Sequence, residues 1–237
     1  SGFISPNQKN RRIIVNMAPA NIRKEGPAYD LPIAIGYLLT TSQISFNTEE
    51  KLFLGELSLD GSLRRINGIL PIAIMAKEYG FKELILPIDN ADEASLVSGI
   101  NILGAKNIKE GTDHLTNKRV LPLTPSKDYF DIMISNNNKS LIDIGDIKGQ
   151  ENAKRALKIA AAGNHNILLY GPPGTGKTML SQALVSILPK MSYEDALEVT
   201  KIYSICGLTN KIPLITSRPF RAPHHTTSRM GLIGGGT

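Results

Sequence analysis

Apolar and polar positions along the first hundred residues predict short strands and helices in turn. Apolar residues recur at helical spacing in some segments and form compact runs, typical of buried strands, in others. Asp60-Gly61 separates two apolar runs, and this dipeptide suits a tight hairpin because it tolerates positive φ. The predicted strands are 12–17, 52–59, 63–66, 81–86 and 101–103, and the predicted helices are 29–40, 69–79 and 91–97. The pattern therefore predicts an α/β domain.

A second pattern of the same kind follows a stretch without periodicity. Between about 111 and 145, prolines and the polar run at 135–139 interrupt any repeat, so we interpret this stretch as a linker. Beyond it, a buried strand is expected at 166–170, and helices are expected at 150–162, 177–188 and 193–203. A strand, a glycine-rich turn and a helix therefore follow one another in this part of the chain.

Composition limits the class of protein. The 237 residues are 41% hydrophobic, which is enough for packed cores and fits two domains. The longest apolar stretch, Leu31 to Leu39, contains a proline and is far shorter than the roughly 20 residues of a membrane helix, so we expect no membrane span. The chain has one cysteine, Cys206, and lacks a basic-then-apolar leader, so we expect a cytoplasmic protein.

Charge is unevenly distributed. The formal net charge is +6, and after Glu198 the chain has basic residues and no acidic ones. Such a basic tail can contact the phosphates of a nucleotide or a nucleic acid, although charge alone favours an ordinary solvated surface. The basic residues of the tail are Lys201, Lys211, Arg218, Arg221 and Arg229.

The segment 171–178 reads Gly-Pro-Pro-Gly-Thr-Gly-Lys-Thr and matches the phosphate-binding motif G-x-x-x-x-G-K-[ST] in full. In this motif, backbone N–H groups surround the phosphates at the start of the following helix. We expect Lys177 to neutralise the β- and γ-phosphates and the Thr178 hydroxyl to bind Mg²⁺. A chance match by a glycine-rich turn is the alternative, and the flanking strand and helix argue against it. The sequence therefore predicts ATP or ADP with Mg²⁺ bound by Gly171, Pro172, Pro173, Gly174, Thr175, Gly176, Lys177, Thr178 and Met179.

Acidic residues that could assist hydrolysis are not found where P-loop enzymes place them. A carboxylate pair is expected at the end of a later apolar strand, but the acids after Lys177 are Glu194, Asp195 and Glu198, all within the helical segment 193–203. We therefore expect a truncated ATPase domain, with no catalytic residue identified, that binds ATP but hydrolyses it very slowly.

The segment from Ile144 to Thr237 resembles the Mg-chelatase-like branch of the AAA+ ATPases, and the whole chain resembles the bacterial ComM/YifB family. The motifs that carry the resemblance are Asp146-Ile147-x-Gly149-Gln150, the phosphate-binding loop and Arg218-Pro-Phe-Arg-Ala-Pro-His224-His225. The resemblance implies that Ile147 and Gln150 lie near the adenine. It also implies a hexameric ring motor that remodels branched or single-stranded DNA, independently of sequence, in recombination and natural transformation. For His224 and His225 a structural loop is favoured over a metal site, because only two ligands are visible.

The segment from Arg12 to Glu110 resembles the proteolytic domain of Lon-type proteases, a fold similar to domain 2 of ribosomal protein S5. Segment 24–28 matches the part that holds their nucleophilic serine, and 61–80 matches the part that holds their catalytic lysine. The alignment places Ala28 and Leu70 at those two positions, and neither side chain can serve as nucleophile or base. The resemblance therefore implies a non-proteolytic scaffold or interaction module.

Together these observations predict a Lon-protease-like α/β domain at 1–112, a linker at 113–143 and the first part of an AAA+ α/β domain at 144–237. The leading functional hypothesis is an ATP-binding motor that acts on DNA. A Mg-chelatase motor subunit, which would remodel a partner that inserts metal into a porphyrin, is the main alternative. An ATP-dependent protease is disfavoured by Ala28 and Leu70, and a protein that only binds nucleotide is the non-enzymatic alternative.

Overall fold

The computed structural model describes residues 2–4, 13–17, 26–126, 129, 132–133, 142–209 and 212–234. Packing divides the chain into two compact units. The first unit comprises Ser1–Ile132 and Leu197–Ile215, and the second comprises Met133–Ala196 and Thr216–Thr237. The expectations for Arg12, 24–25, 135–139, Lys211 and 235–237 lie outside the described residues.

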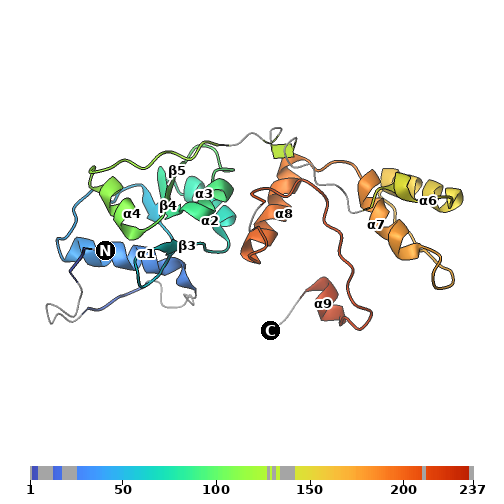
Figure 1. The fold of residues 1–237 in the computed structure, drawn as a ribbon, viewed down its shortest axis with the longest axis horizontal. Helices are drawn as coiled ribbons and strands as arrows, with labels where there is room; N and C mark the ends of the chain where they lie inside the picture. The colour runs from blue at the N-terminus through green and yellow to red at the C-terminus, as the bar shows by residue number, and fades with distance from the viewer. Residues whose placement is uncertain are drawn as a thin grey trace. The chain divides into compact units, whose positions relative to one another are not determined.

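A parallel sheet of three strands forms the centre of the first unit (Figure 1). Its spatial order is β1 (Lys51–Phe53), β4 (Glu83–Pro87) and β5 (Asn101–Ala105). Parallel neighbours need a crossover connection, and here α2 (Ile69–Glu78) precedes β4 while α3 (Ile88–Ala94) joins β4 to β5. The predicted helix at 69–79 and the strands at 81–86 and 101–103 are confirmed to within a few residues.

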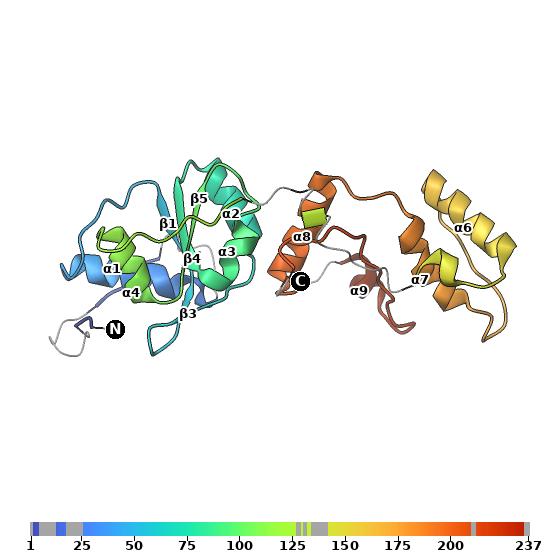
Figure 2. The same cartoon turned by 45° about the horizontal axis from the view of Figure 1, so that its top comes forward.

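Helices cover both faces of this sheet. α1 (Asp30–Thr40) and α4 (Ile108–Leu115) lie on one side, and α2 and α3 lie on the other (Figure 2). Because strand side chains alternate, Ile85 and Leu103 pack with α1 and α4, whereas their buried neighbours Leu84, Leu86 and Ile102 point to the opposite face. The sheet is therefore buried on both sides, as parallel sheets are.

A short antiparallel hairpin lies between β1 and α2 along the chain. β2 (Glu56–Leu57) pairs with β3 (Leu63–Arg64), and Gly61 in the intervening turn has a φ of 89°. The Asp60 Oδ1 atom accepts hydrogen bonds from the Ser62 amide and hydroxyl, at 2.9 and 2.7 Å. The predicted Asp60-Gly61 hairpin is confirmed, although the long strand expected at 52–59 is divided into β1 and β2.

The strand expected at 12–17 is not formed in its described part. Residues 13–17 have no strand assignment, and the side chains of Ile14 and Val15 are exposed. Strand propensity does not suffice here, because a strand exists only where a neighbour completes its hydrogen-bond ladder. The helix expected at 91–97 does form, but as α3 it begins earlier, directly after Pro87.

The second unit is helical among its described residues. A 3-10 helix, η3 (Ile144–Asp146), precedes α6 (Glu151–Gly163) and α7 (Lys177–Ile187), and α9 (Arg229–Ile233) lies near the end of the chain. Buried Leu157 of α6 packs with Leu180 and Ala183 of α7 in one core cluster. The helices expected at 150–162 and 177–188 are confirmed. α8 (Tyr193–Ile205), expected at 193–203, is also confirmed, and its residues from Leu197 onward pack in the first unit.

The buried strand expected at 166–170 is wrong. Ile167 and Leu169 do pack on the α6–α7 core, but Leu168 and Tyr170 are 90% and 98% exposed. Among the described residues no strand pairs with this segment, and none of its backbone groups bonds to another backbone group. The alternation of inward and outward side chains is that of a strand, but the ladder that defines one is missing from the described part of the chain. The described second unit is consequently not the α/β layer that the sequence predicts.

No helix in the described ranges is long and apolar enough to cross a membrane.

The first unit contains a fully buried asparagine that fixes the turn before α2. Asn90 of α3 has no exposed surface, and its Nδ2 atom donates to the Ile66 carbonyl at 2.8 Å while its Oδ1 atom accepts from the Ile66 amide at 2.9 Å. These two hydrogen bonds satisfy the backbone amide and carbonyl of Ile66, a residue that lies outside the strands and helices.

We expect Asn90→Ala to lower the free energy of unfolding of the first unit by about 2 kcal/mol or more, because the Ile66 amide and carbonyl would stay buried without partners. Chemical denaturation followed by circular dichroism measures this. Asn101→Ala, at an exposed position of β5, is the matched control and should change stability by less than about 0.5 kcal/mol. Equal effects of the two substitutions would contradict the role given to Asn90.

Candidate functional site

The glycine-rich loop 171–176 connects the extended segment 166–170 to the first residue of α7. Gly174 and Gly176 have φ values of 82° and 84°, in the left-handed region that favours glycine. A Cβ atom added at either position would meet no other atom within 4 Å. The backbone conformation, rather than a lack of space, therefore explains why these two positions are glycine.

The start of α7 presents backbone donors that have no backbone partner among the described residues. Gly176 is the N-cap and makes no side-chain cap, and the first amide in this turn to bond back along the chain is that of Leu180, to the Gly176 carbonyl. The amides of Lys177, Thr178 and Met179 thus remain at the positive end of the helix dipole. No acidic residue lies in this first turn. The arrangement is that of an anion-binding helix terminus.

Lys177 folds back over the loop. Its Nζ atom donates to the carbonyl oxygens of Gly171, at 2.9 Å, and Pro172, at 2.6 Å, and approaches the Thr175 hydroxyl at 3.4 Å. The Thr175 hydroxyl in turn donates to the Pro172 carbonyl at 3.0 Å. These bonds hold a positive charge against the loop and close to the free amides of α7.

Thr178 and Met179 complete the first turn. Both are exposed, and the Thr178 hydroxyl has no hydrogen-bond partner among the described residues. No group of three or more His, Cys, Asp or Glu side chains that could hold a metal occurs in the described parts of the chain. A hydroxyl at this position fits Mg²⁺ that arrives with phosphate oxygens, since this ion is commonly bound by few protein ligands together with substrate phosphates.

Gln150, at the start of α6, contacts the loop. The Gln150 Nε2 atom donates to the Thr175 carbonyl at 3.4 Å, and Gln150 itself has a φ of 58° at the N-cap of α6. Ile147 is 6% exposed and belongs to the core cluster under α6 and α7. The structure therefore brings Gln150 to the loop, whereas Ile147 acts in the packing beneath it.

Asp146 takes part in the capping of the short helix η3, whereas the N-cap of α6 is Gln150. The Asp146 Oδ2 atom accepts from the Asp143 amide at 3.0 Å, while Asp143 Oδ1 accepts from the Gly145 amide at 2.7 Å, which closes a capping box around η3. A contact that the sequence does not predict anchors this turn: the Ile144 amide donates to the Ser186 hydroxyl of α7 at 3.1 Å. No local sequence signal connects residues this far apart.

The basic residues of the tail differ in how far their side chains are exposed. Lys201 pairs with Glu198 at 2.7 Å, and Arg218 Nε donates to the Pro189 carbonyl at 2.8 Å. Arg221 and Arg229 are exposed. Exposure alone therefore distinguishes Arg221 and Arg229 from Lys201 and Arg218, and Arg221 also interacts within the chain.

The two histidines of the tail lie against each other on an exposed loop. The ring centroids of His224 and His225 are 4.1 Å apart, and the His224 Nδ1 atom lies 2.7 Å from the Thr226 hydroxyl. No third metal-binding side chain of the described residues joins them.

The positions that match the Lon serine and lysine lack reactive groups in the structure as well. Ala28 lies in the short 3-10 helix η2 (Pro27–Tyr29), and its carbonyl accepts from the Gly55 amide at 3.1 Å. Leu70 of α2 is fully buried. Leu70 thus serves the packing of the first unit, and Ala28 contributes a backbone hydrogen bond to it.

Comparison with known proteins places these features in a family. A family model described as "Magnesium chelatase, subunit ChlI" matches residues 143–237, and one described as "Subunit ChlI of Mg-chelatase" matches residues 4–90. The competence protein ComM of Haemophilus influenzae is 43% identical over 228 residues, which are 96% of this chain and 44% of that protein. The YifB protein of Escherichia coli is 39% identical over 237 residues, which are 100% of this chain and 45% of that protein.

A shorter similarity concerns the first unit. An archaeal Lon protease of Archaeoglobus fulgidus is 44% identical over 54 residues, which are 23% of this chain and 9% of that protein. The chain therefore spans less than half the length of the ComM and YifB proteins and shares a short region with Lon. Matches to both ChlI models and alignment along nearly its full length with ComM and YifB show that the chain belongs to the ComM/YifB family of Mg-chelatase-like ATPases.

Proposed function

We propose that this chain binds ATP or ADP with Mg²⁺ at the loop 171–178 and is the nucleotide-binding part of a ring-forming motor that acts on DNA. The observation that carries the proposal is the open N-terminus of α7 beneath Lys177. Free amides, a helix dipole and a lysine ammonium converge there, and together they match the charge of a triphosphate.

Each residue of the loop has a distinct part in this proposal. The amides of residues 177–179 donate to phosphate oxygens, and the Lys177 ammonium exchanges its bonds to the Gly171 and Pro172 carbonyls for bonds to the ligand. The Thr178 hydroxyl binds Mg²⁺, which supplies charge neutralisation for the phosphates. Gln150, bonded to the Thr175 carbonyl, holds the loop against the start of α6 on the side proposed for the adenine.

We expect Lys177→Ala to weaken nucleotide binding by about tenfold or more, because it removes a charge-assisted hydrogen bond of about 1.5–3 kcal/mol. Titration with a fluorescent nucleotide measures the affinity. Lys190→Ala is the matched control, since this exposed lysine after α7 has no hydrogen bond or ion pair among the described residues. Unchanged affinity in a folded Lys177→Ala variant would contradict the site.

Hydrolysis by this chain is proposed to be very slow. Two of the acids that follow Lys177 are engaged on α8 or at its start: Glu198 pairs with Lys201, and Asp195 Oδ2 accepts from the Ser192 amide at 3.4 Å. None of them is placed to orient an attacking water at the loop by any contact among the described residues. A phosphate-release assay on this chain, beside the Lys177→Ala variant, tests the proposal.

Action on DNA is proposed from the exposed part of the basic tail. Arg221 and Arg229 are exposed and positively charged, and the sequence has no acidic residue after Glu198. Contacts of this kind read the phosphate backbone rather than base edges, so they suit branched or single-stranded DNA of any sequence. The name of the ComM relative, a competence protein, is consistent with this role.

In a full-length, ring-forming protein, we expect Arg221→Ala combined with Arg229→Ala to weaken DNA binding equally for all sequences. The dependence of log affinity on log salt concentration should become shallower by about one unit for each phosphate that the variant no longer neutralises. Fluorescence anisotropy at several salt concentrations measures both quantities. Lys118→Ala combined with Arg119→Ala removes the same charge from an exposed part of the first unit. If both pairs act alike, the tail has no special role in DNA binding.

A Mg-chelatase motor subunit is the second candidate, because both family models that match the chain describe the ChlI subunit. Such a motor would remodel a partner protein rather than DNA. Steady-state ATPase activity of a full-length form, measured with and without DNA, separates the two candidates. Stimulation by DNA supports the first, and its absence favours the second.

A further inference from the structure

A segment from the ATPase-like region of the chain packs in the first unit. Residues Leu197–Ile215, which we call the arm, belong to the first unit, whereas the residues on both sides of the arm belong to the second. One ChlI family model matches 143–237, which includes the arm, and the other matches 4–90, which includes the turn before α2 that the arm contacts. The first unit therefore holds a piece of the region that carries the phosphate-binding motif.

Part of this contact lies at the turn before α2. The Gly68 amide donates to the Ser204 carbonyl of the arm at 2.9 Å. Gly207 of the arm has a φ of 70°, and a Cβ atom added there would lie 2.8 Å from the Asn67 Nδ2 atom. The arm and the turn thus approach each other so closely, and with such a backbone, that position 207 favours glycine.

A cluster of three side chains forms another part of the contact. The Thr209 hydroxyl accepts from Arg65 Nη2 and donates to Glu93 Oε2, both at 2.9 Å, and Arg65 also pairs with Glu93 directly. Arg65 Nη1 donates to the Asp89 carbonyl at 2.9 Å, which fixes the guanidinium to α3. The ion pair thus lies wholly outside the arm, and the arm contributes one neutral hydroxyl to the cluster.

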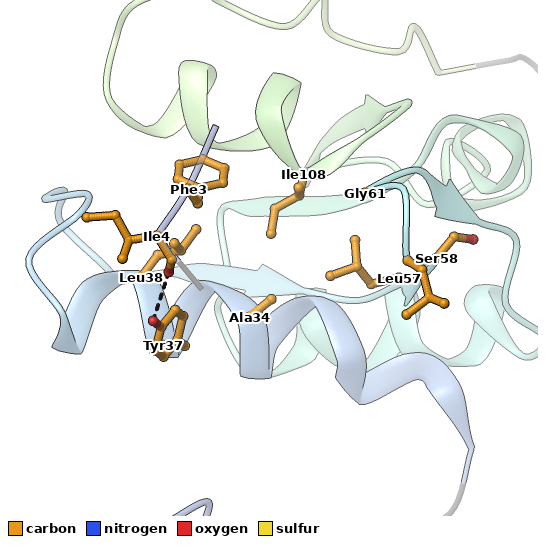
Figure 3. A pocket seen from close by; sticks show the side chains of 10 residues that line it. Phe3, Ile4, Ala34, Tyr37, Leu38, Leu57, Ser58, Gly61 and Ile108 are labelled. Carbon is orange, nitrogen blue, oxygen red and sulfur yellow. Dashed lines mark hydrogen bonds between the residues drawn. The ribbon is translucent and has the colours of Figure 1, made fainter. Parts of the chain in front are cut away.

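Buried polar atoms without partners gather at this contact. Among the described residues, the buried side-chain atoms that have no hydrogen-bond partner are Arg65 Nε, Glu93 Oε1, Ser204 Oγ and Ser58 Oγ. The first three belong to residues of the contact, whereas Ser58 lines a hollow beside α1 that no residue of the contact lines (Figure 3). A buried atom of this kind has lost its bonds to water and gained none in return. The docked arm therefore carries a desolvation cost at the contact itself.

The arm is also held together by its own hydrogen bonds. The Ile215 amide donates to the buried Thr200 hydroxyl of α8 at 2.9 Å, and the Leu208 amide donates to the Tyr203 carbonyl at 2.8 Å. Neither bond uses a group of the first unit outside the arm. The arm can therefore leave that unit with its helix and its turn intact.

We propose that the first unit holds the arm reversibly, so that the arm leaves and returns while the rest of the unit stays folded. When the arm leaves, the Arg65–Glu93 pair stays together, because both partners lie outside the arm. Water then reaches the unpartnered atoms of the pair, and its hydrogen bonds offset those lost with Thr209. Release follows from thermal opening and needs no nucleotide at the loop 171–178.

Reversible holding gives the first unit a role that needs no cleavage chemistry. Ala28 and Leu70 stand at the positions that match the Lon serine and lysine, and neither can act as nucleophile or base. The docked arm fixes the end of α8 to the first unit, whereas after release α8 stays attached only through its start at 193–196 in the second unit. The first unit thus restrains a helix of the ATPase-like region.

Native-state hydrogen exchange of the whole chain, followed for single amides by NMR, tests the proposal. The Gly68 amide reports release, because its partner is the Ser204 carbonyl of the arm. The Leu54 amide, which donates to the Ile85 carbonyl of β4 at 3.0 Å, reports unfolding of the central sheet. The opening that exposes Gly68 should be populated at least about a hundredfold more than the one that exposes Leu54, because local release costs less than global unfolding. Equal populations would overturn the proposal.

Two hydroxyl deletions identify what holds the arm. Thr209→Val removes the hydroxyl that joins the arm to Arg65 and Glu93, and it should speed exchange of the Gly68 amide about tenfold. Thr116→Val is the matched control, because its hydroxyl donates to the Thr112 carbonyl of α4 at 2.8 Å, a bond that release does not break. It should leave exchange at Gly68 unchanged. If both variants affect Gly68 alike, the arm is not held by this cluster and the proposal fails.

Gly207→Ala serves if Thr209→Val does not fold. It adds a Cβ atom against Asn67 where φ is positive, and it should also speed exchange at Gly68 about tenfold. Gly80→Ala introduces the same backbone strain, at a φ of 83°, where no other atom lies within 4 Å. This control should leave Gly68 unchanged, and an equal effect of the two alanines would contradict the proposal.

A variant in the core distinguishes release of the arm from unfolding of the whole unit. Ile35→Val shortens a side chain of α1 that is 3% exposed and belongs to the core cluster. It should speed exchange of the Leu54 amide about fivefold and leave that of Gly68 unchanged, because release does not disturb this core. If both amides exchange faster by the same factor, the arm leaves only when the unit unfolds, and the proposal is overturned.

Discussion

The anion-binding geometry of the second unit depends on the left-handed backbone at Gly176. The chain must turn from the extended segment 166–170 into α7 within a few residues and still leave the first amides of the helix uncovered. A residue with a side chain would resist that φ by about 1–2 kcal/mol, and a capping side chain would occupy the amides. Glycine satisfies both requirements, and the position of Lys177 over the loop follows from it.

The segment that leads into the loop packs, through alternate side chains, on the apolar core between α6 and α7. Ile167 and Leu169 join Leu157 of α6 and Leu180 of α7, so the segment that leads into the loop is fixed by side-chain packing. Its backbone groups make no ladder among the described residues. Among the described residues, the anchoring of the glycine-rich loop therefore rests on apolar contacts and on the Ile144–Ser186 hydrogen bond rather than on sheet pairing.

The first unit is organised differently, because polar groups tie its parts together inside an apolar core. The Arg65 guanidinium bonds to the nearly buried carboxylate of Glu93, and the Thr209 hydroxyl donates to the same carboxylate at 2.9 Å. Thr209 thereby holds the segment after α8 to α3. Such a buried pair is costly to break, since either partner left alone would be an uncompensated charge. The first unit thus combines an apolar core with buried polar ties between its segments.

Sequence alone was enough to place α2, α6, α7 and α8, the Asp60-Gly61 hairpin and the glycine-rich turn at 171–176, because each depends on local hydrogen bonds or on backbone preferences of a few neighbouring residues. Features that need partners distant in sequence could be found only in the folded chain. The segments 13–17 and 166–170 carry strand-like sequences but lack partner strands in the described chain, since a strand needs hydrogen bonds from residues distant in sequence. Distant partners also decided the pairing of Gln150 with Thr175 and of Gln43 with Ile4, because only folding brings those side chains within bonding distance.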